Sequence, residues 1–144
     1  MEPLNFMKLE IPALSANEAF ARSTVAAFAF SLNPTLEEVN DIKTAVSEAV
    51  TNCVIHAYEG KGLGTITITS RLFDNRIEII ICDTGKGIAD VTKALQPFFT
   101  TGPEGERSGM GFTMIKALMT SMEVESRIGV GTTVIMTKQI KSED

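Results

Sequence analysis

Asp83, Gly85 and Gly87 form the segment with the clearest chemical content, because an acidic residue and two spaced glycines directly follow an apolar run from Ile77 to Cys82. A carboxylate at the end of a strand accepts hydrogen bonds from a ligand, and glycines let the backbone approach that ligand closely. Further glycines follow at Gly102, Gly105, Gly109 and Gly111. This concentration of glycine predicts a nucleotide pocket with a mobile flap, although Gly-x-Gly alone is a weak signal.

Three common nucleotide motifs do not fit this pattern. No stretch carries the Walker A arrangement, in which two glycines flank four residues and Lys and Ser or Thr follow. The dinucleotide fingerprint fails at residues 109–111, because Met114 occupies its third glycine position. The His-Arg-Asp and Asp-Phe-Gly motifs of protein kinases are also absent from the sequence. The pocket must therefore belong to another class.

Glu48, Asn52 and His56 recur at intervals of four within a segment of helical periodicity, so they form a polar stripe beside its apolar face. Taken alone, such a stripe is more typical of a solvated helix flank than of a binding site. It gains a functional interpretation only from the segments that accompany it.

Four segments follow one another in a fixed order along the chain. They are Glu48-x-x-x-Asn52-x-x-x-His56, Asp83-x-Gly85-x-Gly87, Gly109-Met110-Gly111-Phe112 and Gly129-x-Gly131-Thr132-Thr133. This order strongly resembles the N, G1, G2 and G3 boxes of the gyrase, Hsp90, histidine kinase and MutL (GHKL) superfamily of ATP-binding domains. Within that superfamily the chain is most similar to the small bacterial serine kinases that act as anti-sigma factors in spore-forming bacteria. Residues 47–52, 99–101 and 106–112 carry this closer resemblance, and Gly102 departs from it, where a longer or basic side chain is expected.

The resemblance implies ATP and Mg²⁺ as cofactors. In this interpretation Asn52 holds Mg²⁺ between the ATP phosphates, and an amide oxygen suits that ion. Asp83 accepts a hydrogen bond from the adenine amino group, and Thr133 lies near Asp83 and completes the adenine contacts. Backbone N–H groups at the start of a helix bind phosphates, because the helix dipole favours an anion there. In this chain the resemblance assigns the phosphate-binding N–H groups to Gly109, Met110 and Gly111.

The other implied ATP-binding residues are Gly85, Gly87, His56, Thr100, Thr101, Arg107 and Ser108. Arg107 and Ser108 would reach the outer phosphates from a lid that runs from Thr84 to about Ser108, and for His56 a structural role remains an equal alternative. Glu48 lies one helical turn before Asn52, and we interpret it as the general base that orients a substrate hydroxyl during phosphoryl transfer.

The function implied by the resemblance has two parts. As a serine protein kinase, the chain would phosphorylate a serine of an anti-anti-sigma factor with Mg-ATP. As an anti-sigma factor, it would bind and inhibit a sporulation-type sigma factor, and the resemblance also implies a homodimer. Two alternatives stay open. One is a non-catalytic, ATP-gated switch that binds a partner, and the other is a histidine-kinase-type catalytic domain acting in trans.

The composition excludes several classes of protein. The chain has 144 residues and a net charge of −5, so we expect one compact domain over residues 1–144 and no direct contact with nucleic acid. The resemblance implies that this domain binds ATP. The N-terminus lacks the features of a signal peptide, and the apolar runs are too short to span a membrane. Two distant cysteines without Cys-x-x-Cys spacing are typical of reduced thiols in the cytoplasm.

The elements that must position these residues can be read from periodicity. Alternation predicts strands over residues 6–11, 65–72 and 77–82 and a closing hairpin of residues 124–128 and 132–137. Capping boxes at Ser15–Glu18 and Thr35–Glu38 predict the starts of two helices. The apolar face expected for the second helix consists of Leu36, Val39, Ile42, Val46, Val50 and Cys53.

The region after Asp83 is less regular. Ala89 to Leu95 has the pattern of a short helix, and another helix is expected to open at Gly109 with Phe112, Ile115, Leu118, Met119 and Met122 on its inner side. Residues from about Lys138 onward are expected to fray. The fold class that follows is an α/β (α+β) two-layer sandwich, with a mixed, mostly antiparallel sheet and helices on one face. The resemblance implies that this is a Bergerat-type ATP-binding fold.

Overall fold

The computed structural model describes residues 2–60, 64–95 and 111–141. Two helices and a strand precede the middle of the chain: β1 (Asn5–Pro12), α1 (Asn17–Ala29), a short 3-10 turn (Phe30–Leu32) and α2 (Leu36–Asn52), which continues into a π-helical turn (Cys53–Ala57). The second half contains β2 (Thr65–Phe73), β3 (Arg76–Asp83), α3 (Val91–Ala94), α4 (Gly111–Leu118), β4 (Ser121–Arg127) and β5 (Gly131–Gln139).

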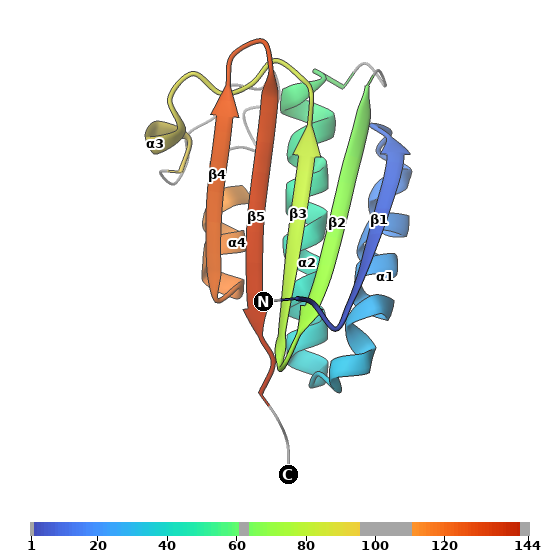
Figure 1. Ribbon diagram of the computed structural model, residues 1–144. Helices are drawn as coiled ribbons and strands as arrows, with labels where there is room; N and C mark the ends of the chain where they lie inside the picture. Colours follow the sequence, from blue (N-terminus) through green and yellow to red (C-terminus); the bar gives the residue numbers. More distant parts are fainter. Residues whose placement is uncertain (1, 61–63, 96–110, 142–144) are drawn as a thin grey trace.

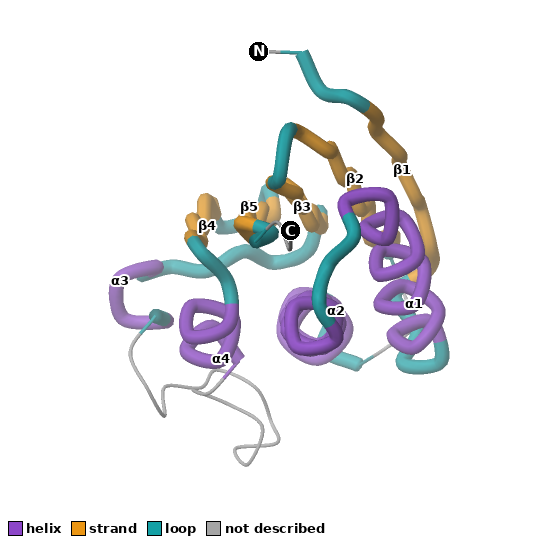
Figure 2. Tube along the Cα trace, turned by 90° about the horizontal axis from the view of Figure 1, so that it is seen from below, coloured by secondary structure: helices purple, strands orange, loops and turns teal. Residues whose placement is uncertain are grey.

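The described strands form one five-stranded sheet in the order β1-β2-β3-β5-β4. All four pairings are antiparallel, so the parallel component of the expected mixed sheet does not occur among them. Helices α1, α2 and α4 cover one face of the sheet (Figure 1), and the view along the strands separates the two layers clearly (Figure 2). The expected two-layer fold is therefore confirmed.

The core lies between the sheet and α1, α2 and α4. The strand alternation predicted from the sequence is confirmed, because Ile66, Ile68 and Leu72 of β2 and Ile77, Ile79 and Ile81 of β3 are all buried. From α2, the core receives Val39, Ile42, Val46, Val50 and Cys53. Leu36 was wrongly assigned to this face: it is the first residue of α2 and is 77% exposed.

The two predicted capping boxes have different outcomes. At α2 the box is formed, since Glu38 N donates to Thr35 Oγ1 at 3.1 Å and Thr35 N donates to Glu38 Oε1 at 2.8 Å. At α1 the N-cap is Ala16, and it makes no side-chain cap. Glu18 instead pairs with Arg22 of the same helix and accepts a hydrogen bond from Ser47 of α2. These two contacts occupy the carboxylate that the capping box would need.

The end of the described chain is anchored rather than frayed, contrary to expectation. Lys138 Nζ lies 2.9 Å from Asp41 Oδ2 of α2, and it also donates to the Leu118 carbonyl at the end of α4. Ile140 is 1% exposed, and its N–H donates to the carbonyl of Asn75 in the β2–β3 turn. Met122, expected on the last helix, lies in β4. No helix in the described ranges is both long and apolar enough to cross a membrane.

Candidate functional site

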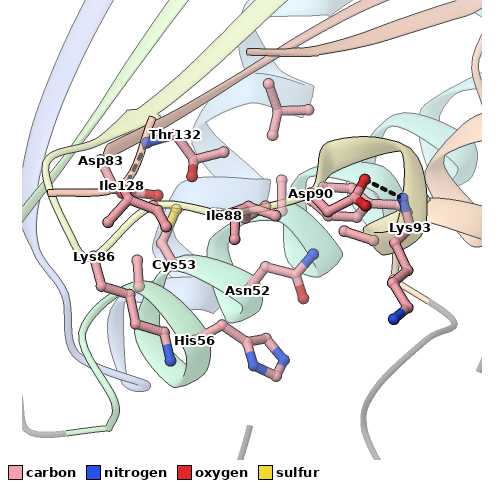
Figure 3. Close-up of a pocket in the computed structure, with 18 residues that line it drawn as sticks. Asn52, Cys53, His56, Asp83, Lys86, Ile88, Asp90, Lys93, Ile128 and Thr132 are labelled. Carbon is pink, nitrogen blue, oxygen red and sulfur yellow. Dashed lines mark hydrogen bonds between the residues drawn. The ribbon is translucent and has the colours of Figure 1, made fainter. Parts of the chain in front are cut away.

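A cavity of about 550 Å³ opens where α2, the turn after β3, the start of α4 and β5 meet. This volume falls within the range of pockets that hold drug-sized ligands and cofactors. Figure 3 shows that the labelled side chains around it come from α2, from the segment after Asp83 and from the β4–β5 hairpin. Segments far apart in the sequence therefore share one concave site.

Asp83 lies at the end of β3 against the inner wall of this cavity and is 5% exposed. Burial raises the pKa of its carboxyl, while hydrogen bonds from the Gly85 N–H, the Cys53 side chain and the Thr132 N–H act in the opposite direction. Both backbone donors reach Oδ1, at 2.9 Å from Gly85 N and 3.2 Å from Thr132 N. The second carboxylate oxygen therefore keeps acceptor capacity for a donor on a ligand.

The turn after Asp83 runs close to the neighbouring backbone and requires glycine. Gly87 has a φ of +78°, and a Cβ at this position would lie 2.2 Å from the Arg127 carbonyl oxygen at the end of β4. Lys86 N donates to the Ala57 carbonyl at 3.1 Å, and the Lys86 carbonyl accepts from Gly129 N at 2.9 Å. The turn is thus held between the end of α2 and the β4–β5 hairpin.

The π-helical turn Cys53–Ala57 widens the end of α2 at the place where it meets this turn. In it, Tyr58 N donates to the Cys53 carbonyl at 3.1 Å. Cys53, His56 and Ala57 all line the cavity. Turns of this kind within α-helices occur frequently at functional sites. The pKa of the Cys53 thiol is raised well above its ordinary value, first by burial and then by the nearby Asp83 carboxylate, so this thiol stays protonated.

Asn52 and the first turn of α4 meet at the other side of the cavity. A Cβ on Gly111 would lie 2.9 Å from Asn52 Nδ2 and 3.1 Å from Oδ1, so the helix start rests directly on the amide. The described residues contain no cluster of three or more His, Cys, Asp or Glu side chains that could hold a metal ion. An ion at Asn52 would take its remaining ligands from a bound phosphate and water, which fits the coordination habits of Mg²⁺.

The structure brings together most of the described residues that the sequence pointed to. Asn52, His56, Asp83, Gly87 and Gly111 line the cavity, and Gly85 lies in the same turn. Glu48 does not line it and sits half-buried on α2, one turn before Asn52. Six predicted ATP-binding positions fall outside the described residues: Thr100, Thr101, Arg107 and Ser108 of the expected lid, and Gly109 and Met110 at the expected helix start.

Thr133 is misplaced in the sequence-based assignment. The strand register pairs Asp83 with Thr132 and Cys82 with Thr133, so Thr132 shares the side of the sheet on which Asp83 lies. Thr132 lines the cavity, whereas the Thr133 hydroxyl contacts the Cys82 sulfur at 3.4 Å. The neighbour of Asp83 in this motif is therefore Thr132. The sequence-based assignment was shifted by one residue along β5, and such a shift moves a side chain to the other face of the sheet.

Two lysines of the lining were not selected from the sequence, Lys86 and Lys93. Lys86 lies between the two glycines of the motif, and its position alone could have marked it. Lys93 lies in α3. Asp90 is the N-cap of that helix, and its Oδ1 accepts a hydrogen bond from Lys93 N at 3.0 Å. Figure 3 shows Lys86 on the His56 side of the cavity and Lys93 on the Asp90 side. The lining therefore carries two lysines beside the carboxylates of Asp83 and Asp90.

Sequence comparisons agree with this geometry. Residues 11–138 match the profile of the family described as "Histidine kinase-like ATPase domain". Proteins named anti-sigma F factor match nearly the whole chain. One from Caldanaerobacter subterraneus subsp. tengcongensis is 59% identical over 140 residues, covering 97% of both chains. One from a Thermoanaerobacter species is 57% identical over 143 residues (99% of both), and one from Bacillus licheniformis is 49% identical over 136 residues (94% of this chain, 93% of the relative).

Solved structures show the same fold at much lower identity. The RsbU and RsbW domains of a Mycobacterium tuberculosis protein superimpose with a TM-score of 0.69 at 20% identity, over 96% of this chain and 32% of that one. The catalytic domain of the histidine kinase ThkA gives a TM-score of 0.59 at 17% identity, over 95% of this chain and 97% of that one. At these identities the likeness concerns the fold alone.

Proposed function

Because the chain belongs to the histidine kinase-like ATPase domain family and groups there with the proteins named anti-sigma F factor, we propose that it is an anti-sigma factor and an ATP-dependent serine protein kinase. In this proposal it binds and inhibits a sporulation-type sigma factor. It also transfers the γ-phosphoryl group of Mg-ATP to a serine of an anti-anti-sigma factor. The binding part rests on the names of the relatives, and the kinase part on the residues beside the cavity.

The observation that carries the proposal is the convergence of Asn52, Asp83 and Gly111 on one cavity. Asp83 offers a buried acceptor that an adenine amino group can reach, while Gly111 places the start of α4 at the other side. Lys86 and Lys93 supply positive charge in the lining. An ATP molecule needs an acceptor for its base and N–H donors for its phosphates. In this proposal Asp83 supplies the acceptor and the start of α4 supplies the donors.

Asn52 is the residue that would hold Mg²⁺. Its amide lines the cavity beside the start of α4, where phosphates are favoured. When bound, Mg²⁺ neutralises charge on the phosphates during transfer. Arg107 and Ser108 of the expected lid would complete the phosphate contacts. The family resemblance is the ground for including them in the proposal. His56 lines the cavity near Lys86, and in this proposal it would border the nucleotide.

Glu48 is proposed as the general base. Its place on α2, one turn before Asn52 and outside the cavity lining, suits a group that contacts the second substrate rather than the nucleotide. A serine hydroxyl that approaches the γ-phosphate from that side would donate its proton toward the Glu48 carboxylate. Phosphoryl transfer is mainly positioning and charge neutralisation, so a base contributes chiefly by orienting the nucleophile.

The test is incubation with γ-labelled ATP, Mg²⁺ and candidate anti-anti-sigma proteins, followed by mapping of the labelled residue. We expect label on a serine of the partner. Glu48→Gln should keep its ATP affinity and lose phosphorylation by roughly 10²- to 10⁴-fold. Glu37→Gln, the same change on an exposed residue in the first turn of α2, is the matched control and should behave as the wild type. Equal rates for Glu48→Gln and wild type would reject the base assignment.

One observation favours a second candidate, a non-catalytic switch that binds a partner only with ATP. Glu48 does not line the cavity, so the nucleotide contacts proposed for the described residues do not depend on it. A switch would bind a sigma factor in an ATP-dependent manner and leave every partner unlabelled. The same labelling experiment, combined with a pull-down with and without ATP, separates the two candidates. The proposed homodimer is tested independently by the molar mass of the protein in solution.

A further inference from the structure

Tyr58 contacts the turn after Asp83 without lining the cavity, and the nucleotide contacts proposed above give it no role. It directly follows the π-helical turn that ends α2, and its ring packs against the edge of the core. Its hydroxyl donates to the Thr65 carbonyl at 2.9 Å and accepts from the Thr84 N–H at 2.7 Å. One phenol therefore joins the end of α2, the start of β2 and the first residue after β3.

The Thr84 N–H belongs to the peptide group between Asp83 and Thr84, and this group is held at both ends. The Tyr58 hydroxyl binds its N–H, as described above. On the carbonyl side, β5 lies so close that a Cβ on Gly131 would be 2.1 Å from the Asp83 oxygen. The peptide plane cannot turn without losing the bond to Tyr58 or colliding with β5.

The orientation of this peptide group decides where the first donor to the Asp83 carboxylate lies. Gly85 N–H, two residues along the chain, donates to Asp83 Oδ1 at 2.9 Å. Thr84 is the link between them, so rotation about its peptide moves the Gly85 N–H away from that oxygen. The carboxylate would then keep the Thr132 N–H, which is fixed in β5 at 3.2 Å. A carboxylate with one fixed backbone donor instead of two samples more orientations.

We propose that Tyr58 is a positioning residue for base recognition: its hydroxyl fixes the Asp83–Thr84 peptide and thereby aligns the Asp83 carboxylate with the exocyclic amino group of adenine. This inference rests on the proposed function. Tyr58 touches no nucleotide atom in this arrangement and acts through Asp83. It is also the single tyrosine of the sequence, so no other tyrosine hydroxyl can take its place in a variant.

The test compares two nucleotides in wild type and in Tyr58→Phe, which keeps the ring and removes the hydroxyl. ATP carries the amino group, and purine riboside triphosphate lacks it. The loss of one hydrogen bond that supports ligand binding weakens the affinity for the ligand by a factor of about 2 to 10. We expect Tyr58→Phe to bind ATP about 2- to 10-fold more weakly and to bind purine riboside triphosphate about as well as the wild type does. The preference for ATP should therefore shrink by that same factor.

Thr35→Ala is the matched control, because it removes the capping box at the opposite end of α2 and lowers stability without touching the cavity. It should keep the wild-type preference between the two nucleotides. A merely structural Tyr58 would behave like this control, so an unchanged ATP preference in Tyr58→Phe overturns the inference. If wild type itself bound neither nucleotide, the proposed function and the inference would fail together.

A measurement on the wild type keeps the inference testable if Tyr58→Phe does not fold. The Thr84 amide should exchange with solvent deuterium slowly in the nucleotide-free protein, because it is bonded to the Tyr58 hydroxyl. The Gly129 amide, bonded to the Lys86 carbonyl in the same region, gives the internal comparison. Free exchange at Thr84 together with protection at Gly129 would show that the tyrosine does not hold the peptide, and would overturn the inference.

Discussion

Asp83 faces two opposed requirements, because a ligand acceptor should be ionised and a buried carboxyl resists ionisation. Burial raises its pKa, and the Gly85, Cys53 and Thr132 hydrogen bonds offset part of that effect. A carboxyl whose folded-state pKa lies above its unfolded value binds its proton more tightly when folded. The stability of the protein must then fall as pH rises through this pKa, and stay lower above it.

Asp83→Asn should therefore separate stability from binding. The amide keeps an oxygen for the Gly85 and Thr132 donors and avoids the cost of a buried charge. We expect the variant without nucleotide to melt higher than wild type at neutral pH, with the gap closing as pH falls and Asp83 becomes protonated. Thermal unfolding of both proteins across a pH series measures this. A gap that widens toward acid would contradict the sign.

The same substitution should cost ATP affinity. Hydrogen bonds to a charged group are worth about 1.5–3 kcal/mol, so we expect Asp83→Asn to bind ATP roughly 10- to 150-fold more weakly. Titration calorimetry gives the two dissociation constants. Asp74→Asn makes the same chemical change in the exposed β2–β3 turn and should leave the affinity unaltered. A similar loss in both variants would assign the effect to net charge.

At the scale of elements, the two capping boxes show how far a local motif predicts structure. The box of Thr35 and Glu38 is formed and also reaches the end of the chain, because Glu38 Oε2 accepts from Lys141 N at 2.9 Å. The box expected at Ser15 is absent, because Glu18 is engaged with Arg22 and Ser47. Two similar motifs in the sequence are thus expected to contribute differently to the free energy of unfolding.

Alanine substitutions test this difference. Thr35→Ala should lower the free energy of unfolding by about 1 kcal/mol, the usual effect of removing a helix cap. Ser15→Ala should change it by less than about 0.5 kcal/mol, as expected for a surface position. Denaturant unfolding of the two variants beside wild type provides the comparison. Equal losses would mean that the Ser15 cap is populated in solution.

Strand β2 carries one polar residue on its buried face. Ser70 is fully buried, and its hydroxyl has no hydrogen-bond partner among the described residues. An unsatisfied buried polar group costs about 1–3 kcal/mol, so Ser70→Ala should stabilise the protein by roughly 1 kcal/mol. Thr69→Ala, on the opposite face of the same strand, should not. The melting temperatures of the two variants decide the matter, and a destabilised Ser70→Ala would indicate a partner for the hydroxyl.

At the scale of the whole molecule, the cavity joins elements that are distant in the sequence, so a ligand should stabilise the entire fold. ATP at 100 times its dissociation constant should add about 2.7 kcal/mol to the free energy of unfolding. For a chain of this length that corresponds to about 5–10 °C in melting temperature. Thermal shift across an ATP series tests it, and the shift at equal concentration should be much smaller in Asp83→Asn.

The sequence predicted what depends on local pattern and missed what depends on distant partners. Ile66, Ile68, Ile77, Ile79 and Ile81 were placed correctly because strand alternation is decided by one buried face. The order of motifs similarly brought Asn52, Asp83 and Gly111 to one site. Thr132 was missed because its neighbour has the same side chain and only the register with β3 separates them. Lys138 was expected to fray because its partner, Asp41, lies 97 residues earlier.

The position of β5 in the sheet has a consequence for the order of events during synthesis. This strand is the last of the described strands along the chain. It lies between β3 and β4, and its pairing with β3 matches Arg76 to Gln139 at one end and Asp83 to Thr132 at the other. A nascent chain that still lacks residues 131–139 cannot join β3 to β4 in one sheet. The native sheet should therefore form only once residues 131–139 have been made, and until then β3 and β4 each keep an unpaired edge on the side that β5 occupies.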